Sequence, residues 1–132
     1  MIVRPSRAVA LAALLAVALG CGGPPGRGAA VRGRVTCDGR PLAHGLIVFT
    51  PDAERGQHGP GTHARLDEDG RYDLSCADGQ RLPSGWYRVT VAGPVGGTLQ
   101  VADRYRYPER SGLQAQVGDR EEYEFNFRLE GP

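Results

Sequence analysis

Apolar and polar residues alternate along most of the chain after residue 30, which is the pattern of strands that bury one face. The clearest case lies near the end, where four apolar residues share one face of a strand: Tyr123, Phe125, Phe127 and Leu129. No stretch of ten residues in this part of the chain keeps the period of a helix. We therefore expect a domain built of strands and turns.

The alternation predicts about seven short strands, separated by turns rich in Gly, Pro and Asp. They fall at residues 31–37, 46–50, 62–66, 71–76, 86–91, 113–117 and 122–129. The nearly continuous apolar segment 46–50 predicts a strand buried on both faces. Residues 93–112 hold two prolines and predict an irregular excursion. The expected fold class is all-β, a single antiparallel β-sandwich.

The first thirty residues lack this alternation. Residues 1–7 carry two arginines and no acid, and an unbroken apolar run of twelve residues, 8–19, follows them. The run is too short to cross a bilayer as a helix, which needs about twenty residues, and it fits the apolar part of a secretory signal peptide. We expect a signal peptide at 1–20, a Gly/Pro-rich flexible tether at 21–30 and the β-sandwich domain at 31–132.

The apolar run ends in Ala18-Leu19-Gly20-Cys21, which resembles a bacterial lipobox. In that resemblance Cys21 receives a diacylglyceryl thioether, and cleavage before it makes it the acylated N-terminus. The match departs from the usual pattern, which has Leu where Ala18 stands and a small residue where Leu19 stands. The alternative is an ordinary secretory peptide with a cysteine near its cleavage site. Two acyl chains suffice for stable attachment, so we expect a membrane-anchored lipoprotein of the bacterial cell envelope that faces the periplasm or the exterior.

Charge excludes some functions. The chain has 132 residues, enough for one domain, with 16 basic and 15 acidic residues and no long block of either sign. This balance does not support nucleic-acid binding. Every basic residue is arginine, and without lysine a Walker-type phosphate loop, a Schiff-base enzyme and a Ser-x-x-Lys nucleophile are impossible.

Six segments occur in a characteristic order: VRGRVTCDGRPL (31–42), IVFTP (47–51), THARLDEDGRYDL (62–74), LPSGWYRVTV (82–91), YPERSGLQAQV (107–117) and EFNFRL (124–129). This order resembles the carboxypeptidase-regulatory-like domain, a transthyretin-like (prealbumin-like) β-sandwich. It is especially similar to small lipoproteins of that type in planctomycete-like bacteria. The resemblance implies the fold and the cell-envelope location but no catalytic residues, because in zinc carboxypeptidases this module is an accessory to a separate catalytic domain. Cys37, Cys76 and His44 depart from the family pattern.

Motifs for metal sites and catalysis are weak. His44, His58 and His63 are not accompanied by H-E-x-x-H or C-x-x-C, so we predict solvated loop histidines and no metal. Residues 67–73 are similar to part of a calcium loop but lack its twelfth-position Glu, so a hairpin turn is favoured. No serine lies in G-x-S-x-G, and the chain ends in LEGP rather than the tetrapeptide that closes 5-hydroxyisourate hydrolases. We predict no enzyme activity and no cofactor.

Aromatic and basic residues offer a candidate ligand surface. Trp86, Tyr105 and Tyr107 lie in the sequence near Arg88 and Arg104. Surfaces of this composition serve carbohydrate or protein recognition. The alternative is an ordinary loop with two tyrosines packed on the sandwich.

Two cysteines remain if Cys21 is lipidated. Cys37 is in phase with the inward residues of its strand, and Cys76 is in phase with those of another. An exported protein meets oxidising conditions, which allow a Cys37–Cys76 disulfide. The alternative is two buried free thiols.

The function that we predict is a lipid-anchored cell-envelope β-sandwich acting as a non-catalytic binding or structural module. Its partners would be the membrane, through the anchor at Cys21, and an envelope protein or a carbohydrate. The alternative is a soluble secreted or periplasmic protein that binds a small hydrophobic or sugar ligand. A hydrolase is the third class considered.

Overall fold

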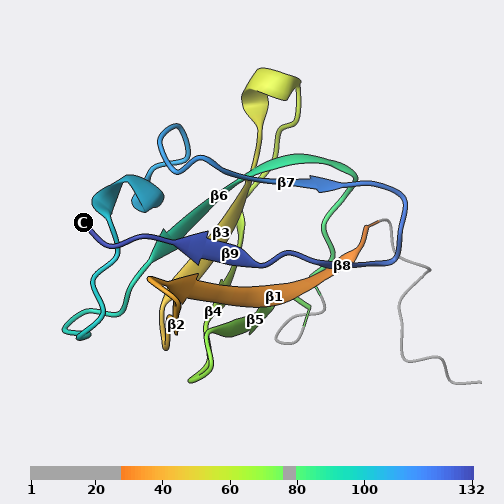
Figure 1. Ribbon diagram of the computed structural model, residues 1–132. Coiled ribbons are helices and arrows are strands. Elements are labelled where there is room, and N and C mark those ends of the chain that lie inside the picture. Colours follow the sequence, from red (N-terminus) through yellow and green to blue (C-terminus); the bar gives the residue numbers. More distant parts are fainter. Residues whose placement is uncertain (1–27, 76–79) are drawn as a thin grey trace, which may run out of the picture.

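The computed structural model describes residues 28–75 and 80–132, which form a sandwich of two β-sheets (Figure 1). The strands are β1 (Ala30–Cys37), β2 (Arg40–Pro41), β3 (Leu46–Pro51), β4 (Thr62–Arg65), β5 (Arg71–Asp73), β6 (Gly85–Ala92), β7 (Leu113–Val117), β8 (Glu122–Glu124) and β9 (Phe127–Leu129). Two short 3-10 helices, η1 (Ala53–Arg55) and η2 (Asp103–Arg106), lie in the connections. The predicted all-β sandwich is confirmed. Its strand number exceeds the prediction because β2 is added and the last strand is divided into β8 and β9.

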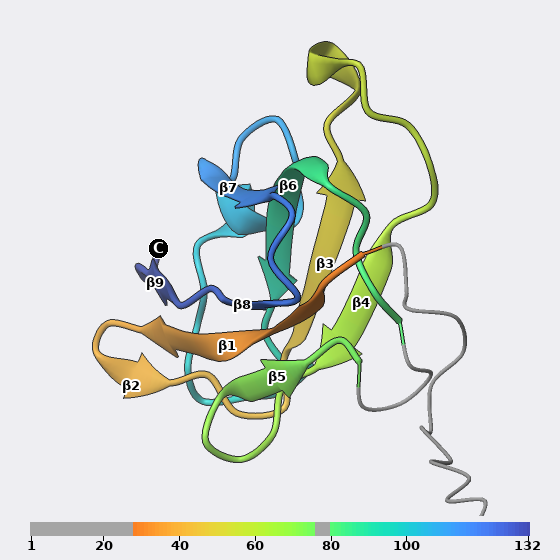
Figure 2. The ribbon, with the colours of Figure 1, turned by 90° about the vertical axis from the view of Figure 1, so that its right-hand side faces the viewer.

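The first sheet is organised around β1. The antiparallel strands β2 and β5 lie along one side of β1, and β8 and β9 pair with its other side (Figure 2). Both β8 and β9 run parallel to β1. The sandwich is therefore antiparallel in most of its strand pairs, and its two parallel pairs both lie along this side of β1. Parallel pairing needs a long connection between the strands, and here most of the chain lies between β1 and β8.

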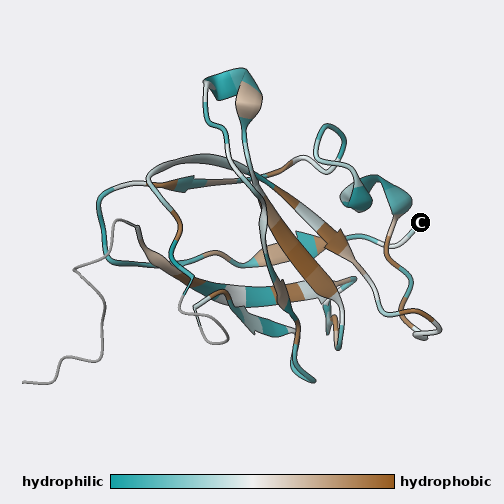
Figure 3. Ribbon diagram, turned by 180° about the vertical axis from the view of Figure 1, so that it is seen from behind, coloured by the Kyte–Doolittle hydropathy of each residue, from teal (hydrophilic) through white to brown (hydrophobic). Residues whose placement is uncertain are grey.

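The second sheet has the order β4-β3-β6-β7, and all its pairs are antiparallel. It carries the most hydrophobic strands of the molecule (Figure 3). In β3, Ile47 and Phe49 are buried, whereas Val48 is half-buried and Leu46 is 39% exposed. Burial of 46–50 on both faces is thus a wrong prediction, because no third layer covers the outer face of this sheet.

Phe49 lies at the centre of the core between the sheets. Its ring is 5.9 Å from that of Tyr72, 6.4 Å from that of Phe125 and 6.2 Å from that of Phe127, measured between ring centroids. These contacts join β3 of one sheet to β5 and to the β8–β9 segment of the other. The inward face predicted for the last strand is confirmed, with Phe127 and Leu129 buried.

Gly33 allows β1 and the β8–β9 segment to approach closely. A Cβ atom at this position would lie 1.8 Å from the backbone oxygen of Phe125. The Tyr72 hydroxyl donates a hydrogen bond to this oxygen at 2.6 Å, and burial raises the pKa of Tyr72 above its ordinary value, helped by the charge of Glu124. The side-chain oxygen of Asn126 accepts from the Arg34 amide at 2.9 Å and continues the pairing where the backbone ladder is interrupted.

The excursion at 93–112 is irregular, as predicted, apart from η2. Tyr105 of η2 is buried and belongs to the core. Among the described residues, no helix has the length and apolar character needed to cross a membrane.

We expect Phe49→Ala to lower the free energy of unfolding by about 3–5 kcal/mol, because it removes the ring that joins the two sheets and leaves a cavity. Leu46→Ala is the matched control, since it shortens an outward-facing residue of the same strand, and its effect should stay under about 1 kcal/mol. Urea denaturation followed by circular dichroism measures both. Equal effects of the two substitutions would contradict the central place of Phe49.

Candidate functional site

The predicted aromatic and basic surface is divided in the structure. Tyr105 is only 3% exposed, so it does not belong to a ligand surface. Its hydroxyl accepts hydrogen bonds from Arg104 at 2.8 Å and from the Glu130 amide at 3.1 Å. These bonds fasten η2 to the C-terminal end of the chain. Tyr107 is 40% exposed and lies under the guanidinium of Arg110.

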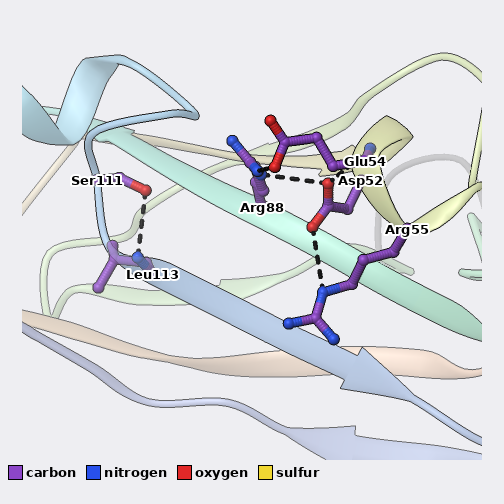
Figure 4. A network of polar contacts seen from close by, with 6 residues as sticks. All are labelled: Asp52, Glu54, Arg55, Arg88, Ser111 and Leu113. Atoms are coloured by element: carbon purple, nitrogen blue, oxygen red, sulfur yellow. Dashed lines mark hydrogen bonds and ion pairs between the residues drawn. The ribbon is translucent and has the colours of Figure 1, made fainter.

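Trp86 and Arg88 lie on the outer face of β6. Arg88 takes part in a network of ion pairs with the loop that contains η1 (Figure 4). The buried Asp52 carboxylate is 3.2 Å from Arg88 Nε and 3.6 Å from Arg55 Nε. Arg88 also pairs with Glu54, and the Arg55 guanidinium lies 4.0 Å above the Trp86 ring. This network fastens the loop that contains η1 onto the sheet, so its charges already have partners.

The pKa of Arg88 also indicates that this arginine is held by structural contacts. Desolvation opposes the charge of Arg88, but the neighbouring Asp52 and Glu54 carboxylates outweigh this effect and raise the pKa of Arg88 above its ordinary value. Asp52 Oδ1 also accepts a hydrogen bond from the Glu54 amide at 3.1 Å and caps η1. Trp86 and Arg88 are therefore positioned by structural contacts.

The histidines and the calcium-like segment offer no metal site in the part of the chain that the structure describes. His44, His58 and His63 are all exposed, and no group of three or more potential metal ligands forms there. Asp67 instead builds a turn, in which its Oδ1 accepts from the Asp69 amide at 2.8 Å and from the Arg71 amide at 2.9 Å. The predicted turn is confirmed, but it does not close a hairpin, because β4 and β5 on its two sides belong to different sheets.

A second set of arginines gathers on the outer face of the first sheet. We call Arg32, Arg34, Arg71 and Arg128 the arginine face; all four side chains are exposed. Arg34 of β1 lies directly opposite Arg71 of β5 in the strand register. Arg128 of β9 lies on the other side of β1, opposite Thr36. Three adjacent strands thus place guanidinium groups on one surface.

Acidic groups modify the charge of this face. Arg32 lies between Asp73 of β5 and Glu124 of β8 in the register. The backbone hydrogen bond from Arg71 and, to a smaller extent, the charges of Arg71 and Arg34 hold the pKa of Asp67 below its ordinary value. The arginine face is therefore a mixed surface in which arginine predominates.

A hollow of about 920 Å³ borders the arginine face. Arg65 and His63 of β4 extend its rim, and Thr36, Asn126 and Gln80 add neutral polar groups. Tyr72, Leu74 and Phe127 supply apolar lining. Guanidinium groups donate hydrogen bonds in a fixed fork that matches carboxylate, sulfate and phosphate groups. The chemistry available here is the binding of an oxyanion.

The sequence contains these arginines but does not indicate that they meet. Each one alternates with buried residues, as in Val31-Arg32-Gly33-Arg34-Val35, which identifies solvent-facing positions of strands. Their proximity depends on the pairing of β1 with β5 and β9. The only available signal was the repeated arginine on the polar side of three separate strands.

Cys37 is a buried free thiol at the end of β1. Its Sγ is 3.6 Å from the backbone oxygen of Gln100, and burial, with a smaller contribution from Asp38, raises the pKa of the thiol. The other cysteines for which we predict roles, Cys21 and Cys76, lie outside the described residues.

The predicted Cys37–Cys76 bridge stays a prediction, because Cys76 lies outside the described residues. The amide of Leu74, two residues before Cys76, donates to the Val31 oxygen at 2.9 Å. Val31 and Cys37 are six residues apart in β1, which corresponds to about 20 Å along a strand. A disulfide requires Cα atoms within about 7 Å, so the position of Cys76 decides between a bridge and two thiols.

Comparisons with known proteins find no family for the chain. No family model matches it, and no curated protein matches it. Similar solved structures include DUF3823 family proteins from Parabacteroides merdae and Bacteroides ovatus, with identities of 19% and 16% and a TM-score of 0.43 for each. Each match covers 76% of this chain. A 9R-lipoxygenase from Cyanothece matches 83% of this chain, with 19% identity and a TM-score of 0.35.

The chain spans less than half the length of each of these structures, namely 45%, 43% and 17%. The name of the DUF3823 family specifies no enzyme activity. The resemblance to the carboxypeptidase-regulatory-like domain therefore stays a prediction from the sequence.

We expect Asp67→Asn to destabilise the domain at neutral pH but not in acid. A carboxyl group whose pKa is lowered by folding stabilises the folded state above its unfolded pKa, about 4, and this contribution disappears as the pH falls through the folded pKa. The difference in unfolding free energy between wild type and variant should therefore shrink below about pH 4. Urea titrations at a series of pH values measure it. A difference that stays constant down to strong acid would contradict the turn contacts of Asp67.

We expect the Cys37 thiol to resist alkylation in the native protein and to react after denaturation without a reductant. Burial limits access to the thiol, and its raised pKa lowers the thiolate fraction that reacts. Peptide mapping by mass spectrometry after iodoacetamide treatment identifies the labelled residue. Labelling of Cys37 only after reduction would show that it is in a disulfide.

Proposed function

We propose that this protein is an exported, lipid-anchored β-sandwich that acts as a non-catalytic binding module of the bacterial cell envelope. The observation that carries the proposal is the open hollow of about 920 Å³ beside the arginine face. Its arginines project from paired strands, and sites built on strands hold side chains more precisely than sites on loops. The hollow is thus a preformed surface for a ligand.

The chemistry of the hollow favours binding over catalysis. Its predominant charged groups are guanidinium ions, which stay protonated at all ordinary pH values and do not serve as general bases. The carboxylate of Asp67 accepts hydrogen bonds from backbone amides of its own turn. The guanidinium groups are suited to holding a ligand in place.

The N-terminal sequence supports attachment to a membrane. The lipobox-like Ala18-Leu19-Gly20-Cys21 follows a charged start and twelve apolar residues. Cys21 precedes Ala30, where β1 begins, by nine residues. An extended chain of that length reaches about 30 Å, so a lipid on Cys21 would keep the hollow close to the membrane surface. The resemblance to carboxypeptidase-regulatory-like lipoproteins supports the same location.

We expect Cys21→Ser to move the protein from the membrane fraction to the soluble fraction of the producing bacterium, because the acceptor of the two acyl chains is lost. Mass spectrometry of the wild-type N-terminus should show an acylated Cys21. Detergent-phase partitioning measures the anchoring directly.

The matched control is Cys76→Ser, which removes a different cysteine and should leave the protein in the membrane fraction. A soluble wild-type protein with an unmodified N-terminus would reject the anchor and favour a secreted or periplasmic binding protein.

A further inference from the structure

We propose that the arginine face binds an acidic oligosaccharide, a sugar chain that carries carboxylate or sulfate groups. This inference rests on the proposed function, since it names the ligand class of the same hollow. It does not depend on the lipid anchor, because the hollow belongs to the folded domain alone.

The strongest indication is the direct opposition of Arg34 and Arg71. These residues are cross-strand partners on β1 and β5 and project from the same face of the sheet. Like charges in this arrangement destabilise a sheet. Within the described residues neither guanidinium makes an ion pair; Arg34 Nε only donates to the backbone oxygen of Asp69 at 3.0 Å. An anionic group placed between the two would remove their repulsion and receive hydrogen bonds from both.

The spread of the arginines favours a ligand with more than one anionic group. Arg71, Arg34 and Arg128 lie on three successive strands, β5, β1 and β9, and neighbouring strands are about 4.8 Å apart. The positive groups therefore extend over about 10 Å. The hollow of about 920 Å³ is far larger than a single inorganic anion and is comparable to pockets for extended organic ligands. An oligosaccharide with repeated acidic groups fits both the spread of the arginines and the volume of the hollow.

The neutral and acidic residues of the face favour a sugar over a membrane surface. Attraction to anionic lipids depends on clusters of basic residues without intervening acids. Here Asp73 and Glu124 flank Arg32, and Asp67 lies near Arg34 and Arg71. Sugar hydroxyl groups, in contrast, need both donors and acceptors. The hollow provides an acceptor on Glu124 and both kinds of group on Asn126 and Gln80, whereas Asp67 and Asp73 already accept hydrogen bonds from their own turns.

Calorimetric titration of the full-length Cys21→Ser variant, which carries no acyl chains, in buffer without detergent tests this proposal. The probes are oligogalacturonate, which carries carboxylates, a heparin-derived sulfated hexasaccharide, neutral maltohexaose, and phosphatidylglycerol vesicles. We expect one or both acidic oligosaccharides to bind, more weakly as salt is added, while maltohexaose and the vesicles do not.

Substitutions connect this binding to the arginine face. Arg34→Gln and Arg71→Gln should each weaken binding at least tenfold, because each removes a guanidinium group that would contact the anionic groups, and circular dichroism should show that both variants stay folded. The matched control is Arg106→Gln, which removes an exposed arginine of η2 on another part of the surface and should leave binding unchanged.

Four results would overturn the proposal: no binding of either acidic oligosaccharide, equal binding of maltohexaose, binding of the vesicles alone, or unchanged affinity in both arginine variants. Lipidation of Cys21 is scored separately by mass spectrometry. Failure of the ligand class and failure of the anchor therefore give different outcomes.

Discussion

Backbone pairing along both sides of β1 holds the two ends of the folded domain together. One side pairs with β2 and β5, and the other with β8 and β9. The hydrogen bond between the Arg34 amide and Asn126 spans 92 residues of sequence. Closing so long a loop costs conformational entropy, which the aromatic contacts of Phe49 with the β5 and β8–β9 segments help to offset. The core and the first sheet therefore stabilise each other.

Charge is arranged differently on the outer faces of the two sheets. On β6 the guanidinium of Arg88 faces the carboxylates of Asp52 and Glu54, and Arg55 covers Trp86. These contacts secure the loop that contains η1. On the first sheet, Arg34 and Arg71 face each other and no carboxylate among the described residues forms an ion pair with them. Arg34 donates instead to the backbone oxygen of Asp69, and the charges of both arginines act on Asp67, so the charges of this face are paired less closely than those on β6.

Much of the candidate ligand surface predicted from the sequence is structural. Tyr105 has an aromatic ring suited to a ligand, but the fold buries it against β6 and the C-terminal end. Proximity in sequence suggested that Tyr105 and Arg104 belonged with Trp86 and Arg88. The strand order places η2 and the η1 loop in separate connections, each held by its own contacts. Composition identified residue types that bind ligands, but it did not indicate which of them remain accessible.

The sequence by itself determined the strands, their inward faces and the turns, because these depend on local periodicity and on residues that favour tight turns. The periodicity correctly predicts that Tyr72 and Phe127 face inward. The turn residues correctly predict the turn that contains Asp67. Only the tertiary structure decided that β8 and β9 run parallel to β1 and that Leu46 faces outward. It also decided that arginines from β1, β5 and β9 share one surface. These features depend on pairing between strands far apart in the sequence, and alternation within a strand carries no information about its partner or register.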